Sequence, residues 1–181
     1  MKRKLIFALA VMFVTSFVWA CSKDDKTAPQ EQTPPEEEPS KETPDPKEEL
    51  HVYLCFGQSN MEGNAKVEEQ DLVGVDSRFM VLQAVDCSDK GREKGKWYTA
   101  VPPLARCYTG LTPVDYFGRT MVQHLPENIK IGVINVSVGG CKIELFDKDN
   151  YAAYVSEAPD WLKNMVNEYG GNAYGRLVNM A

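Results

Sequence analysis

The sequence predicts an α/β fold for residues 51–181, in the form of a three-layer α/β/α sandwich around a parallel sheet. Apolar runs at 52–56, 79–85 and 129–138 are typical of buried strands, and the first is expected to be buried on both faces. Apolar residues at helical spacing lie between and after these runs and predict amphipathic helices. Two of the strands lead into glycine-containing turns, as strands of open α/β sheets do at the edge where ligands bind.

The first strand leads into the strongest functional signal. It leaves through Gly57-Gln58-Ser59-Asn60, which places Ser59 at the carboxyl end of a buried strand. Gly57 permits a sharp turn and leaves room beside the serine hydroxyl. We expect the amides of Ser59 and Asn60 to point outward, free to bind an anionic oxygen. The alternative is a structural Ser-Asn turn between a strand and a helix.

The middle of the domain continues the alternation of strands and helices. After the second strand, residues 87–112 are expected to form a long loop, which in a compact domain serves a binding surface or carries an insertion. Thr112 followed by Pro113 is typical of a helix start, and apolar spacing predicts a helix that ends near Pro126. The third strand, 129–138, ends in Gly139-Gly140.

Two further helices are predicted near the C-terminus. The first begins at Pro159 and ends at Gly170-Gly171, and its apolar positions fall on one side: Trp161, Leu162, Met165, Val166 and Tyr169. The second begins after Asn172 and has no stop signal before Ala181. Three clear parallel strands and an open-ended helix predict a domain that is incomplete at its C-terminus.

The block GQSNMEG, residues 57–63, resembles the first motif of the SGNH, or GDSL-type, hydrolases, whose sandwich is flavodoxin-like. More narrowly, it is similar to the version in sialate O-acetylesterase-like proteins and in acetylxylan esterases of carbohydrate esterase family 6. Gly139-Gly140 resembles the second motif, a glycine whose amide lines the oxyanion hole. In isolation, this glycine pair would be interpreted as a simple turn.

The resemblance implies a serine esterase without a cofactor that removes acetyl groups from a carbohydrate, either sialic acid or a xylan-type glycan. Ser59 would be the nucleophile, the amides of Ser59 and Gly140 would bind the oxyanion with Gly139 as the alternative to Gly140, and Gln58 and Asn60 would contact substrate. The family's later Gln-Gly-Glu and Asp-x-x-His motifs do not occur in this sequence. The resemblance therefore covers about the first half of such a domain. Two alternatives are a glycan-binding lipoprotein without turnover and a nonfunctional fragment.

Neither of the two histidines is expected to act as the base. His51 precedes Ser59 by eight residues of extended strand, roughly 26 Å. His124 lies near the end of the helix that leads back to the opposite edge of the sheet. We therefore expect little or no esterase activity from this chain. The acids Glu62, Glu144 and Asp147 near the site are expected to be solvated.

Among the five cysteines, Cys87 and Cys107 flank the long loop and are the best candidates for a disulfide. Cys55 is expected to pack in its strand as a small apolar side chain, and Cys141 to line the oxyanion loop without acting as a nucleophile. No cysteine or histidine spacing indicates a metal site. No basic stripe or aromatic platform indicates nucleic-acid binding.

Residues 1–20 have a basic start and an apolar run, which is the pattern of a secretory signal. Trp19-Ala20-Cys21 resembles a lipobox, which implies lipidation of Cys21 and a membrane anchor; the alternative is an ordinary cysteine near a cleavage site. Residues 22–49 hold six prolines and ten acids against four lysines, so residues 21–50 are predicted to be an extended linker. We expect an exported lipoprotein on the outer membrane or cell surface, with the periplasm as the alternative.

Overall fold

The computed structural model describes residues 47–181. The predicted signal at 1–20, Cys21 and most of the acidic linker lie outside the described residues. Within residues 47–181, no helix combines the length and the apolar character needed to cross a membrane.

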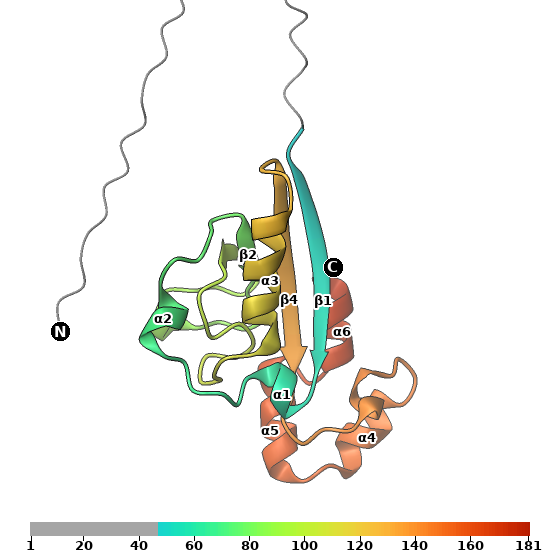
Figure 1. Cartoon of the computed structure of the whole chain (residues 1–181). Coiled ribbons are helices and arrows are strands. Elements are labelled where there is room, and N and C mark those ends of the chain that lie inside the picture. The colour runs from blue at the N-terminus through green and yellow to red at the C-terminus, as the bar shows by residue number, and fades with distance from the viewer. Residues whose placement is uncertain (1–46) are drawn as a thin grey trace, which may run out of the picture. The chain divides into compact units, whose positions relative to one another are not determined.

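A four-stranded sheet forms the centre of the domain (Figure 1). Its strands are β1 (Glu49–Gly57), β2 (Phe79–Leu82), β3 (Trp97–Thr99) and β4 (Ile129–Ser137), in the order β1-β4-β2-β3. β4 pairs in parallel with β1 and β2, whereas β3 is antiparallel to β2. The predicted α/β fold with a mostly parallel sheet is confirmed.

Helices cover both faces of this sheet, as the predicted three layers require. α3 (Pro113–His124) packs on one face, where buried side chains of the sheet and helix form one cluster that includes Val81, Val114 and Val133. On the other face, α5 (Asp160–Glu168) and α6 (Ala173–Asn179) form a second cluster with Val136 and Leu162 among its members. Alternate residues of β4 enter the two clusters because successive strand side chains point to opposite faces.

The predicted start of α3 is confirmed in its details. The side chain of Thr112 accepts a hydrogen bond from the amide of Val114 at 2.9 Å, and Pro113 occupies the first helical position. Asp115 returns a hydrogen bond to the amide of Thr112 at 2.8 Å, which completes a capping box. This cap fixes where the helix starts over the sheet.

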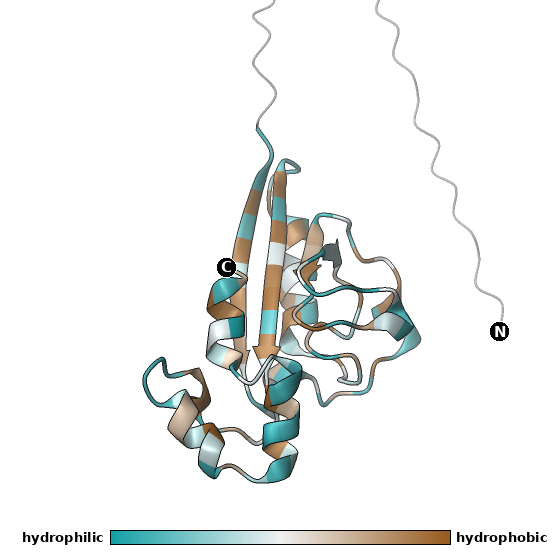
Figure 2. Cartoon of the chain, turned by 180° about the vertical axis from the view of Figure 1, so that it is seen from behind, coloured by the Kyte–Doolittle hydropathy of each residue, from teal (hydrophilic) through white to brown (hydrophobic). Residues whose placement is uncertain are grey.

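The prediction that the first strand is buried on both faces is wrong. β1 lies at the edge of the four strands, and Leu50, Val52, Leu54 and Phe56 on one face are each 43–44% exposed. Figure 2 shows hydrophobic bands along both β1 and β4. An unbroken apolar run predicts two buried faces, but burial depends on which elements cover each face, and within residues 47–181 none covers this one fully.

The sequence predicted a continuous loop for residues 87–112, but the structure differs. These residues contain β3 and a short 3₁₀ helix, Ser88–Lys90. The second strand also ends at Leu82, three residues before the predicted end. A three-residue strand is too short for an alternating pattern, so pairing with β2 rather than the local sequence produces β3.

Short helices that the sequence did not predict surround the carboxyl end of the sheet. α1 (Ser59–Glu62) follows β1 directly, and α4 (Tyr151–Glu157) follows a 3₁₀ helix at Ile143–Phe146. α2 (Glu69–Leu72) lies in the connection to β2. Figure 1 shows α1, α4 and α5 gathered at the end of the sheet toward which β1 and β4 point.

Candidate active site

The turns that follow β1 and β4 lie side by side. The two strands pair in parallel, with Gly57 opposite Ser137, so both turns leave from the same edge. The amide of Val138 donates to the carbonyl oxygen of Gly57 at 3.0 Å. A Cβ atom placed on Gly139 would lie 4.0 Å from the Cα of Ser59. The fold therefore brings together the serine and glycine motifs that lie far apart in the sequence.

Ser59 is the first residue of α1 and is half-buried. The amide of Glu62 donates to the carbonyl of Gln58 at 2.8 Å, and the amide of Gly63 donates to that of Ser59 at 3.0 Å, which closes the turn. The amides of Ser59 and Asn60 make no hydrogen bond to another of residues 47–181. Free backbone donors beside a serine hydroxyl can bind an oxygen that gains negative charge.

The amides of Gly139 and Gly140 are also without a hydrogen-bond partner among the described residues. The two glycines have different surroundings. A Cβ on Gly139 would lie 2.7 Å from Oε2 of Glu62, whereas a Cβ on Gly140 would lie 2.8 Å from Cη2 of Trp161. Gly140 also has a φ of +72°, which side-chain-bearing residues rarely adopt. Gly139 thus borders Ser59, and Gly140 borders Trp161.

Gln58 and Asn60 flank Ser59 on the exposed side of the turn. Their side chains form no hydrogen bond with any other residue in the part of the chain that the structure describes. Both amide groups are therefore available to a ligand that approaches Ser59. Their role as substrate-binding residues stays a prediction.

The expectation that Glu62 is solvated is wrong. Its side chain is buried, and Oε1 accepts two hydrogen bonds from Arg106, from Nε at 3.1 Å and from Nη2 at 2.5 Å. Nη1 of Arg106 donates to Glu168 at 2.5 Å. Burial alone would lower the pKa of Arg106, but the bonds to Glu62 and Glu168 raise it overall. Glu144 and Asp147 are exposed, as expected.

Sequence reasoning missed the role of Arg106 because the arginine is separated from Glu62 by 44 residues. The charge of Glu62 in a turn motif was the only local signal. The pair forms because the 101–112 segment folds across α1. Local spacing patterns in the sequence do not predict a contact of this kind.

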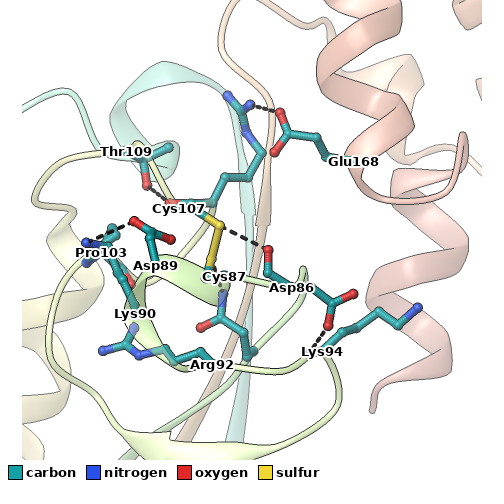
Figure 3. The surroundings of a disulfide bond; sticks show 12 residues. Asp86, Cys87, Asp89, Lys90, Arg92, Lys94, Pro103, Cys107, Thr109 and Glu168 are labelled. Atoms are coloured by element: carbon teal, nitrogen blue, oxygen red, sulfur yellow. Dashed lines mark hydrogen bonds and ion pairs between the residues drawn. A yellow bond between two sulfur atoms is a disulfide. The ribbon is translucent and has the colours of Figure 1, made fainter.

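A disulfide between Cys87 and Cys107 anchors the segment that carries Arg106 (Figure 3). It joins the turn after β2 to the residue directly after Arg106 and confirms the predicted pair. Around it, Arg92 donates to the carbonyl oxygens of Pro103 at 3.0 Å and Val101 at 2.6 Å. The Oγ1 of Thr109 donates to the carbonyl of Arg106 at 2.8 Å. Because Cys107 directly follows Arg106 in the chain, the disulfide holds the backbone at Arg106 in place.

Asn135 supports the serine turn from the sheet side. This buried β4 side chain donates through Nδ2 to the carbonyl of Met61 at 2.9 Å, and its Oδ1 accepts from Oγ of Ser137 at 2.7 Å. The buried hydroxyl of Tyr169 donates to the carbonyl of Ser137 at 3.1 Å. Polar residues at 135 and 137 in an otherwise apolar strand are the sequence signal that could have revealed this support.

Both histidines lie away from the serine turn, as predicted. His51 is near the start of β1, where it contacts Glu49 at 3.4 Å, and His124 is the last residue of α3. The parallel strands begin at this edge, whereas Ser59 follows the edge where they end. Neither histidine can therefore receive the proton of the Ser59 hydroxyl.

The two free cysteines near the site are not nucleophiles. Burial raises the pKa of Cys55 to about 11. Burial and, to a lesser extent, the charge of Glu62 raise the pKa of Cys141 to about 11. Both thiols are protonated at neutral pH, and only the thiolate is strongly nucleophilic. Residues 47–181 contain no group of three histidine, cysteine or acidic residues placed to hold a metal ion.

The family comparison agrees with this arrangement. Residues 49–171 match the family of carbohydrate esterases described as sialic acid-specific acetylesterases. The X-ray structure of an Arabidopsis thaliana protein is similar at 17% identity and a TM-score of 0.42, over 65% of this chain and 50% of that one. The chain thus spans about half the length of that protein. The family match extends from the start of β1 to Gly171, just after α5, and includes both turns of the candidate site. The chain belongs to the sialic acid-specific acetylesterase family of carbohydrate esterases.

Proposed function

We propose that the carboxyl edge of the sheet is the serine half of a carbohydrate O-acetylesterase site. The supporting observation is the juxtaposition of Ser59 with Gly139, in a place where four backbone amides are free to donate. In the family to which the chain belongs, an acetylated sugar is the substrate class. We propose acetylated sialic acid or an acetylated xylan-type glycan as the substrate.

The chemistry follows from these groups. The Oγ of Ser59 attacks the acetyl carbonyl carbon while a base takes its proton, and the carbonyl oxygen gains negative charge that the amides of Ser59 and Gly140 or Gly139 stabilise. The sugar hydroxyl leaves with a proton and the acetyl group stays on Ser59. Water then attacks this ester and releases acetate. No cofactor enters these steps.

The base is not among the described residues near Ser59, because both histidines lie at the other edge. We therefore expect the 181-residue chain to hydrolyse p-nitrophenyl acetate little, and no faster than its Ser59→Ala variant. General-base catalysis contributes about 10²–10⁴-fold, so a free base should partly restore the reaction. Efficient hydrolysis by the chain alone that disappears in Ser59→Ala would show that a base is present after all.

Serine-directed labelling tests the proposal itself. The chain is incubated with a fluorophosphonate, with and without about 100 mM imidazole as an external base. Such a base should accelerate the labelling reaction on the order of 10²-fold. The modified peptide is identified by mass spectrometry. We expect imidazole to accelerate labelling at Ser59 and to leave the exposed Ser88 unlabelled. Ser59→Ala should abolish the signal, and the matched Ser88→Ala should not. Equal rates at the two serines would contradict an activated Ser59.

A second candidate is a glycan-binding protein without turnover. The position of both histidines favours it, because a binding site needs no base. In this case sugars bind, but imidazole produces no labelling of Ser59. A reading frame that continues beyond Ala181 into Gln-Gly-Glu and Asp-x-x-His motifs would favour the esterase instead.

A further inference from the structure

A pocket of about 310 Å³ opens beside Gly140. The residues that line it include Trp161, Lys142, Tyr154 and Glu157. Gly140 forms one side of the pocket, and its neighbour Gly139 lies against Ser59. Only Gly139 therefore lies between Ser59 and the glycine that lines the pocket. The pocket is at the carboxyl end of the sheet, where Figure 1 shows α4 and α5.

The exposure of Trp161 differs from that of other apolar residues predicted on the same side of its helix. Leu162 and Val166 of α5 are buried, but Trp161 is 52% exposed. Single exposed apolar residues are common on protein surfaces and need no explanation. Trp161 differs because one edge of its ring lies 2.8 Å from where a Cβ on Gly140 would be, and because the residue lines a pocket. A side chain at position 140 would collide with the indole.

The rest of the lining is polar and free to bind. The side chains of Lys142 and Glu157 form neither an ion pair nor a hydrogen bond with another residue in the range 47–181. The hydroxyl of Tyr154 accepts a hydrogen bond from the amide of Lys142 at 3.0 Å, which fixes the position of the pocket's wall. Ligand pockets commonly combine an apolar or aromatic surface with a few polar groups that orient the ligand.

We propose that this pocket binds a pyranose ring of a glycan, stacked on Trp161, with Lys142 and Glu157 bound to its hydroxyl groups. A pyranose has an apolar face of C–H bonds and a rim of hydroxyls, which matches an aromatic ring beside a cation and an anion. An apolar ligand would leave both charges without partners, and a phosphate would be repelled by Glu157. The orientation, with the acetyl group toward Ser59, rests on the proposed esterase function.

Tryptophan fluorescence tests the binding directly and needs no turnover. In a protein of residues 22–181 that carries Trp97→Phe, Trp161 is the only tryptophan. This protein is titrated with xylobiose, with N-acetylneuraminic acid and with methyl β-D-galactopyranoside. We expect a saturable change in emission with at least one of the three sugars. The sugar that binds tightest identifies the glycan class.

Variants are compared by isothermal titration calorimetry in the protein that retains Trp97. Loss of an aromatic stack reduces affinity about tenfold, so Trp161→Ala should weaken binding by about that factor and Trp161→Phe by less. Glu157→Gln should also weaken binding. Tyr108→Ala, which removes an aromatic side chain that is 89% exposed and does not line the pocket, should leave the affinity unchanged.

The outcomes separate this inference from the esterase proposal. Absence of saturable binding for all three sugars, or unchanged affinity in Trp161→Ala with an unchanged thermal melt, would overturn the sugar pocket even if Ser59 is labelled. Sugar binding that depends on Trp161, without accelerated labelling of Ser59, would support the pocket and count against the esterase. Retained sugar affinity in Ser59→Ala is expected, because the pocket lies beside the serine and not on it.

Discussion

The guanidinium of Arg106 donates two hydrogen bonds to one carboxylate oxygen of Glu62, the last residue of the turn that begins at Ser59. The side chains of Arg106 and Glu62 are 12% and 8% exposed. Because Cys107 is disulfide-bonded and Glu62 is in α1, this pair connects the anchored loop to the serine turn. The geometry of the candidate site therefore depends on residues that are far from Ser59 in the sequence.

Removal of Arg106 should destabilise the domain strongly. Arg106→Met leaves the buried carboxylate of Glu62 without its partner, and loss of one member of a buried pair costs about 3–5 kcal/mol. Chemical denaturation followed by circular dichroism measures the loss. Lys130→Met, which breaks the exposed pair with Glu48 at 2.6 Å, is the matched control and should cost less than about 1 kcal/mol. Similar losses in the two variants would contradict the central role of the Arg106 pair.

Loss of the disulfide should also destabilise the domain. Cys87 and Cys107 are separated by 20 residues, and closing a loop of this length contributes about 3 kcal/mol to stability. We expect the double Cys87→Ala, Cys107→Ala variant to unfold at lower denaturant concentration by that amount. Replacement of the half-buried Cys55 by alanine is the control for the loss of a cysteine outside the bond, and it should have a smaller effect. Equal midpoints for oxidised and disulfide-free proteins would show that the bond contributes little.

Asp115 should make stability fall as the pH rises from about 4 to 6. Burial, the largest cause, raises the pKa of Asp115 from 3.8 to about 6, although its hydrogen bonds with Thr112 act in the opposite direction. The folded protein then binds a proton more tightly than the unfolded one, so this contribution is complete below pH 4 and lost above pH 6, by about 2–3 kcal/mol. Asp115→Asn keeps an acceptor for the cap and should remove this pH dependence.

Asp76 provides a control of opposite sign for that experiment. Its hydrogen bonds with Arg78 lower the pKa of Asp76, so its contribution is present above the unfolded pKa and is lost as the pH falls. Thermal melts of wild type, Asp115→Asn and Asp76→Asn measure both effects. They are recorded across roughly pH 3.5–7.5, a range that starts near the usual carboxyl pKa of about 4. Identical differences from wild type at every pH in both variants would contradict the assigned pKa directions.

Substitution of the two site glycines should have distinguishable effects. Gly140→Ala places a side chain 2.8 Å from Trp161 and on a backbone with φ of +72°. We expect a loss of about 1–2 kcal/mol and a shift in tryptophan emission as the indole moves. Gly139→Ala instead contacts Glu62 and should destabilise the domain without changing the emission. An emission shift in Gly139→Ala alone would reverse the assignment of the two glycines.

The exposed face of β1 should bind an apolar dye. Leu50, Val52, Leu54 and Phe56 form a continuous stripe on this face, and exposed apolar stripes of this kind bind anilinonaphthalene sulfonate. Val52→Thr with Leu54→Thr should reduce dye fluorescence severalfold while the thermal melt stays cooperative. The control Val133→Thr, in the buried core, should lower the melting temperature and raise dye binding. Unchanged fluorescence in the β1 variant would show that the dye binds elsewhere.

The same melts address whether the domain is a nonfunctional fragment. A cooperative transition for residues 47–181 would count against that alternative, since two-state unfolding requires a packed core. The two buried clusters on opposite faces of β4 support such a transition. A broad, non-cooperative melt would support the nonfunctional-fragment alternative instead.

The sequence by itself determined the class of the fold, the three parallel strands, the cap of α3, the disulfide pair and the family, because each depends on local patterns or on one unusual motif. Tertiary structure alone decided three other features. β1 became an edge strand with one open face, Glu62 became a buried partner of Arg106, and Trp161 turned out to line a pocket beside Gly140. Local sequence sets backbone preference and side-chain chemistry, whereas burial and partnership are set by segments that meet only when the chain folds.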